Sequence, residues 1–180
     1  MKRKSGFGRL IACLGAALAL AGFGGSSTVH AVTQASPQPS VSAIGPVLMT
    51  AAQLRTEAKI LQTSVYWAGP EKRFNYEFRR TTHGYLFLRY LPTGVRAGDP
   101  RARFLIVATY PLAGAYAKLK KSAHGKAIQG PGSSIVVVRP SDRRSVLIAW
   151  PSVPYEVEIY DPHPPVALAT ALSGRVRPNR

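Results

Sequence analysis

Residues 74–91 show the clearest pattern of hydrophobic and polar positions in the chain. In the first half of this segment aromatic residues alternate with polar ones, which is the pattern of a strand with one buried face. These aromatic residues are Phe74, Tyr76 and Phe78. A TTHG sequence typical of a turn follows, and the second half returns as an apolar strand. The segment therefore predicts a β-hairpin, across which Glu77 and Arg89 would face each other as a structural pair.

Other apolar segments predict further strands and helices. The sequence FLIVATY at 104–110 is almost wholly apolar, which indicates a central strand with both faces covered. Three more strands are predicted at residues 135–139, 146–150 and 155–160. Helices are predicted at residues 50–61, with Thr50 as the N-cap, at 111–124 and at 166–172.

The order of these elements predicts the fold class. Strands in hairpin succession, then a helix, more strands and a last helix are typical of an α+β domain. We therefore predict a mainly antiparallel sheet of about six or seven strands, with one or two helices packed on one face. The alternative is a closed β-barrel capped by a helix.

The N-terminus has the features of a signal peptide, which we assign to residues 1–31. Basic residues precede an uncharged run rich in Ala, Leu and Gly at 10–25, and the sequence Val29-His30-Ala31 then offers a cleavage site. We expect an exported protein that is secreted or associated with the cell envelope. The alternative is that the signal is not cleaved and anchors the protein in the membrane.

The rest of the chain divides into three parts by composition. Residues 32–49 are rich in Pro, Ser, Ala and Gln and lack periodicity, which indicates a flexible linker. Residues 50–173 hold the predicted elements and form a single α+β domain. Residues 174–180 form a basic tail. Apolar residues make up 46% of the chain, so wholesale disorder is excluded.

The chain is strongly basic, with 24 Lys and Arg against 8 Asp and Glu and a formal net charge of +16. Removal of residues 1–31 would leave 20 basic residues and the same 8 acidic ones. Such a charge attracts anionic partners, and for an exported protein we expect anionic envelope polymers or lipid headgroups rather than a specific nucleic acid. The residues predicted to bind them are Lys118, Lys120, Lys121, Arg175, Arg177 and Arg180.

Acid–base chemistry has one candidate, the carboxylate pair Glu156 and Glu158. Residues two apart on a strand project from the same face about 7 Å apart, which lies within the range used by inverting glycosidases. With His163 nearby, this pair defines the alternative function, a small extracytoplasmic hydrolase acting on a glycan. The same alternation is typical of any solvated sheet face, so we interpret the pair as non-catalytic.

No sequence motif indicates a metal site or a cofactor, and we predict neither. The three histidines after residue 31 are isolated from one another, and no HExxH sequence occurs. The sequence GPGSS at 130–134 lacks the Gly-Lys-Ser/Thr ending of a phosphate-binding loop. Aromatic residues recur on the predicted strands, among them Trp67, Tyr90 and Trp150, and we expect most of them to pack in the core.

Four segments resemble uncharacterised exported proteins of GC-rich Gram-positive bacteria. They are VYWAGP at 65–70, RYLP at 89–92, GVRAGDP at 94–100 and YEVEIYDP at 155–162. The resemblance implies a recurring domain without an assigned activity, so it transfers no functional residue. Taken with the charge, it predicts an exported basic domain that binds a partner or associates with the envelope and does not catalyse a reaction.

Overall fold

The computed structural model describes residues 44–179. The predicted signal peptide, residues 32–43 of the predicted linker and Arg180 lie outside the described residues. The strands are β1 (Ile44–Met49), β2 (Tyr66–Trp67), β3 (Phe74–Arg80), β4 (Leu86–Pro92), β5 (Ile106–Pro111), β6 (Ile128–Gln129), β7 (Ile135–Val138), β8 (Ser145–Ala149), β9 (Tyr155–Tyr160) and β10 (Arg177–Pro178). The helices are α1 (Ala51–Ile60), α2 (Ala115–Ser122) and α3 (Pro164–Leu172), with a short 3-10 turn at Pro131–Ser133.

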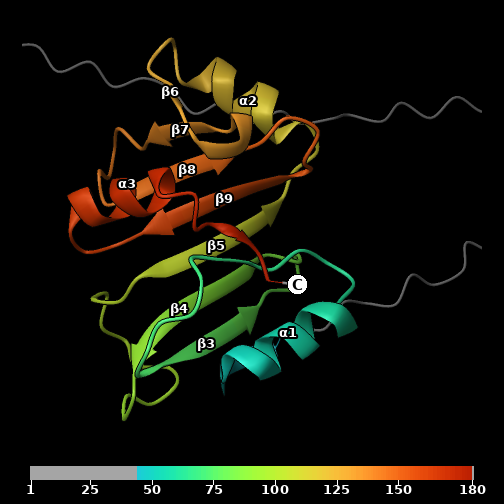
Figure 1. Cartoon of the computed structure of the whole chain (residues 1–180), viewed down its shortest axis with the longest axis vertical. Helices are drawn as coiled ribbons and strands as arrows, with labels where there is room; N and C mark the ends of the chain where they lie inside the picture. Colours follow the sequence, from blue (N-terminus) through green and yellow to red (C-terminus); the bar gives the residue numbers. More distant parts are fainter. Residues whose placement is uncertain (1–43, 180) are drawn as a thin grey trace, which may run out of the picture. The chain divides into compact units, whose positions relative to one another are not determined.

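Within residues 44–179 the main sheet has eight strands in the order β1-β3-β4-β5-β9-β8-β7-β6 (Figure 1). All neighbouring strands are antiparallel, so the predicted α+β class with an antiparallel sheet is confirmed. The sheet is open, and the barrel alternative is wrong. Its edge strands are β1, which has a register shift, and β6, which has two residues, so neither offers a regular ladder for closure.

The first strand corrects the end of the predicted linker, residues 44–49. Ile44–Met49 form β1 and pair with β3. The sequence IGPVLM hides this strand because Gly45 and Pro46 interrupt any alternation and only the two end residues are half-buried. Together with the two-residue β6, it brings the strand count above the six or seven that the sequence predicted.

One face of the sheet, named here the core face, carries α1, α3 and the small β2–β10 ladder. Its buried side chains include Phe78, Leu88, Val107, Ile159, Ile148 and Val136. Helix α1 adds Leu54 and Ala58 to this core. The expected N-cap is confirmed, because the Thr50 hydroxyl accepts the N–H of Gln53 at 3.2 Å and the Gln53 side chain accepts the N–H of Thr50 at 2.8 Å.

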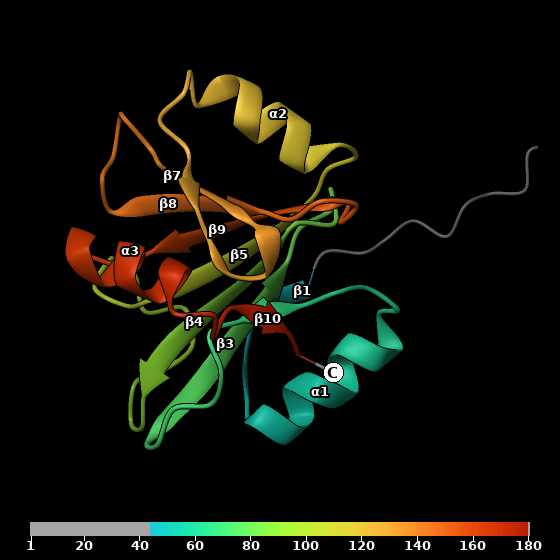
Figure 2. The same ribbon diagram turned by 45° about the horizontal axis from the view of Figure 1, so that its top comes forward.

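The opposite face, named here the α2 face, is covered by α2 at its β7–β8 end. Ala115 and Leu119 of α2 pack against Ile135, Val137 and Ala149. Figure 2 shows α2 and α3 on opposite sides of these strands. The prediction that the helices share one face is therefore wrong. The cause is β7, whose IVVV sequence is apolar on both faces and needs cover on each.

The predicted basic tail, residues 174–180, is also corrected. Arg177–Pro178 form β10 and pair with Tyr66–Trp67 of β2. The side chains of Val176 and Asn179 are only 6% and 3% exposed, and the backbone N–H of Asn179 donates to the carbonyl of Val65 at 2.8 Å. The basic composition hid this segment, because the buried Val176 lies between the exposed Arg175 and Arg177.

Of the three aromatic residues named in the sequence analysis, two pack in the core as expected. Trp67 and Tyr90 are buried in the core. The Tyr90 hydroxyl accepts the N–H of Ala68 at 2.7 Å and donates to the carbonyl of Gly69 at 3.1 Å. Trp150 is half-buried and stacks on the core residue Tyr66, with ring centroids 5.2 Å apart.

Candidate functional site

Four lysines of α2 and the turn after it lie exposed on the molecule. They are Lys118, Lys120, Lys121 and Lys126, named here the α2 basic surface. Their exposure follows from the helix period, because Ala115 and Leu119 turn toward the sheet. No acidic residue occurs from residue 100 to residue 141, and none of these lysines forms an ion pair with a described residue. The sequence prediction included three of the four and missed Lys126, which lies beyond the end of the helix.

The arginines predicted to join these lysines lie elsewhere. Arg175 pairs with Glu71, and Arg177 lies on β10, beside the core face. Helix α2 covers the other face of the sheet, and Arg180 lies outside the described residues. The predicted binding residues therefore do not form one surface, and the structure brings together only those of α2.

The two candidate catalytic carboxylates lie on β9 with their side chains on the α2 face. Between and beside them Val157 and Ile159 are buried in the core, so the prediction that Glu156 and Glu158 share a face is confirmed. The Tyr110 hydroxyl donates to Oε2 of Glu158 at 2.8 Å, and Nη2 of Arg139 lies 3.4 Å from its Oε1. These contacts tie Glu158 to the neighbouring strand β5 and to the residue that follows β7, the strand beyond β8.

Glu156 differs from Glu158, because its half-buried side chain forms no hydrogen bond or ion pair with a described residue. Burial raises the pKa of Glu156, Arg139 lowers it, and the charge of Glu158 raises it. Burial is also the main cause that raises the pKa of Tyr110, and its bond to Glu158 adds to the rise. His163 is not part of this group, since it binds Asp161 at the start of α3.

We expect Glu156→Gln to stabilise the protein at neutral pH. A carboxyl whose pKa is raised by folding contributes its full stability at low pH and loses it as pH rises through the folded pKa. The Gln side chain does not ionise, so the variant does not lose this stability. It should be as stable as the unmodified protein near pH 3 and increasingly more stable toward pH 7. Urea unfolding at several pH values measures it. A destabilising effect at pH 7 would show that the Glu156 carboxylate has a favourable partner.

A second buried group on the α2 face organises the loop between β4 and β5. Glu77 and Arg89 oppose each other in the hairpin as predicted, with Nη1 of Arg89 at 2.8 Å from Oε1 of Glu77. Glu77 also accepts the N–H of Gly98 at 2.5 Å, and Arg89 donates to the carbonyls of Asp99 and Arg101. The pair therefore holds the loop against the sheet, and this role depends on contacts that the hairpin pattern does not reveal.

Neither a membrane-spanning helix nor a metal cluster occurs among the described residues. Among residues 44–179 no helix combines the length and the apolar character needed to cross a bilayer. The same part of the chain has no group of three or more His, Cys, Asp or Glu side chains placed to hold a metal ion. Comparison with known proteins found no match to the chain among family models, curated proteins or solved structures.

Proposed function

We propose that the protein is an exported, non-catalytic binding domain that associates with anionic polymers or lipid headgroups of the bacterial cell envelope through the α2 basic surface. The observation that carries this proposal is the set of exposed lysines without ion pairs on one short helix. Export is supported by the N-terminal sequence, with its basic start, apolar run and cleavage site.

The distribution of acidic residues favours α2 as the contact. All 8 acidic residues of the chain lie in the described part, and five of them pair with arginines. None of these pairs includes a lysine, so the lysines of α2 keep their charge available to a partner. A surface of this kind attracts phosphates and carboxylates by Coulomb interaction without a shaped pocket.

We expect the triple replacement of Lys118, Lys120 and Lys121 by Gln to weaken binding to acidic liposomes or wall polymers about 100-fold at low salt. Each lysine near an anionic surface contributes about 1 kcal/mol, and 1.4 kcal/mol corresponds to a tenfold change in affinity. Co-sedimentation at 0.01 M salt measures the loss. For the unmodified protein, binding should fade toward 0.15 M salt, where the Debye length drops from about 30 Å to about 8 Å.

A matched control removes the same number of charges from the core-face side, by replacing Arg55, Arg175 and Arg177 with Gln. This variant should retain most of the binding, because its changes lie away from α2. Equal losses in both variants would indicate a net-charge effect without a defined surface. Binding that persists at high salt would contradict the electrostatic proposal and favour a ligand pocket.

The alternative function, hydrolysis of a glycan, has one observation in its favour. Burial raises the pKa of Glu156, as in a general acid, beside a second carboxylate on the same face. Against it, Glu158 is occupied by Tyr110 and Arg139, which suits a structural role. Release of sugar reducing ends from wall glycan by the protein, lost in Glu156→Gln, would make hydrolysis the preferred function.

A further inference from the structure

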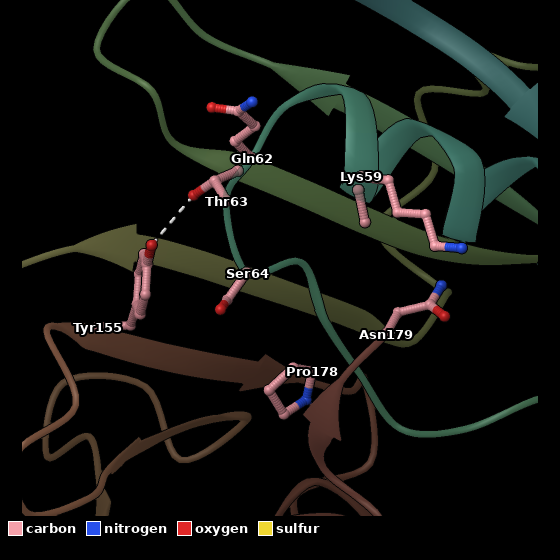
Figure 3. A pocket seen from close by; sticks show the side chains of 8 residues that line it. Lys59, Gln62, Thr63, Ser64, Tyr155, Pro178 and Asn179 are labelled. Atoms are coloured by element: carbon pink, nitrogen blue, oxygen red, sulfur yellow. Dashed lines mark hydrogen bonds between the residues drawn. The ribbon is translucent and has the colours of Figure 1, made fainter.

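A pocket of about 300 Å³ lies on the core-face side, where three separate parts of the chain meet (Figure 3). They are the end of α1 with the segment that follows it, the start of β9, and the C-terminal segment around β10. The polar side chains that line it are Lys59, Gln62, Thr63, Ser64, Tyr155 and Asn179. In a concave site, convergent polar side chains are the groups that fix the orientation of a small ligand.

Asn179 is the most informative residue of the pocket. It is 3% exposed, and neither its side-chain nitrogen nor its side-chain oxygen has a hydrogen-bond partner among the described residues. Buried polar groups are nearly always paired, since leaving them unpaired costs free energy. Both amide atoms are closed off from solvent, so a ligand reaches them only when the soft terminal torsion turns the amide toward the pocket. A bound polar ligand would supply the missing partner.

The charge of the lining indicates the kind of ligand. Lys59 is the one charged residue among the described residues that line the pocket, and it forms no ion pair with another described residue. Figure 3 shows its side chain on the same side of the pocket as the amide of Asn179. An ammonium group beside an amide donor favours a carboxylate or phosphate oxygen.

The remaining groups favour hydroxyls on the same ligand. Gln62 and Ser64 have no side-chain partner among the described residues. The hydroxyls of Thr63 and Tyr155 bond each other at 3.1 Å, and each retains capacity for a further bond. We propose that this pocket binds a small hydrophilic anion of sugar-acid or sugar-phosphate type, whose oxyanion contacts Lys59 and Asn179 and whose hydroxyls contact the opposite wall.

The test uses the protein purified as the full chain, with glucuronate, glucose 6-phosphate and glucose as probes at constant ionic strength. Backbone amide shifts of Ser64 and Asn179 in NMR titrations report occupancy of the pocket itself. Both anions should shift these amides. The affinity for glucose should be at least about tenfold lower than the affinity for either anion. The relative affinity of glucuronate and glucose 6-phosphate shows whether the natural oxyanion is a carboxylate or a phosphate.

Two variants assign the binding to named groups. Lys59→Met should reduce the affinity for both anions about tenfold, to the level of glucose. Asn179→Leu should lose a similar factor while the fold is retained, because an apolar residue of similar volume removes an unpaired amide. Should that variant fail to fold, Asn179→Asp keeps the shape and places a negative charge in the pocket, which should abolish anion binding.

Lys118→Met provides the matched control, since it removes one exposed lysine from α2 and none from the pocket. Its anion affinity should equal that of the unmodified protein. The proposal is overturned if neither anion shifts Ser64 and Asn179, if glucose binds as tightly as glucuronate, or if Lys118→Met loses as much affinity as Lys59→Met. These outcomes are independent of liposome binding, which the α2 variants test.

Discussion

Glu77→Gln should lower the free energy of unfolding by about 3 to 5 kcal/mol, the range for removing one partner of a buried ion pair. Glu77 is 4% exposed and binds both the guanidinium of Arg89 and the N–H of Gly98. The variant leaves the largely buried Arg89 without its counter-charge. It also weakens the attachment of the loop between β4 and β5. Urea unfolding monitored by tryptophan fluorescence measures the change.

The ion pair of Asp142 and Arg144 provides a matched control, because its side chains are 32% and 49% exposed. Asp142→Asn should change the stability much less than Glu77→Gln does, because an exposed ion pair contributes little. A second measurement follows the loop directly: in Glu77→Gln the amide hydrogen of Gly98 should exchange faster with solvent. If Glu77→Gln costs no more than Asp142→Asn, the buried pair does not anchor the loop.

A chain that ends after Arg175 should lose about 3 to 5 kcal/mol of stability. It lacks the buried Val176, worth about 1.5 to 3 kcal/mol, and the hydrogen bonds of β10 and Asn179, worth about 1 kcal/mol each. The loss also exposes Tyr66 and Trp67, which β10 borders in the β2–β10 ladder. Small domains have only about 5 to 15 kcal/mol in total, so the shortened chain should unfold at markedly lower urea concentration.

A control variant in which Arg175 and Arg177 are both replaced by Gln distinguishes the effect of lost charge on stability from the effect of lost packing. This variant keeps the backbone of β10 and loses the exposed ion pair with Glu71, so it should cost no more than about 1 kcal/mol. A shortened chain as stable as this control would mean that Val176, β10 and Asn179 contribute little to the stability.

Local sequence patterns predicted those elements whose stabilising contacts are close in the chain. The hairpin of β3 and β4 is an example, because alternation and turn chemistry act within about 20 residues and place Glu77 opposite Arg89. The N-cap of α1 is another, since Thr50 and Gln53 are three residues apart. In both cases the residues that recognise each other lie within one short segment.

The elements that were missed depend on partners far away in the chain. Strand β1 is interrupted by Gly45 and Pro46 and gains its ladder from β3. Strand β10 has two residues and pairs with β2, more than 100 residues earlier in the sequence. Short strands of this kind carry little intrinsic signal, because β-propensity depends on cross-strand neighbours and burial. The polar pocket around Asn179 was missed for the same reason, as its lining comes from three distant parts of the chain.

The sequence by itself determined the excess of basic residues, the α+β class and the position of β9 with its two carboxylates on one face. Only the tertiary structure decided where the charged groups lie relative to one another. Helix α2 and the segment with Arg175 and Arg177 are both basic. Packing nevertheless places the helix on the α2 face, whereas Arg175 pairs with Glu71 and Arg177 lies on β10 on the other side. The net charge of a sequence does not depend on where its charged residues lie, whereas a charged surface requires charged residues that are close in space. Which residues become close is set by the burial of apolar residues far apart in the chain.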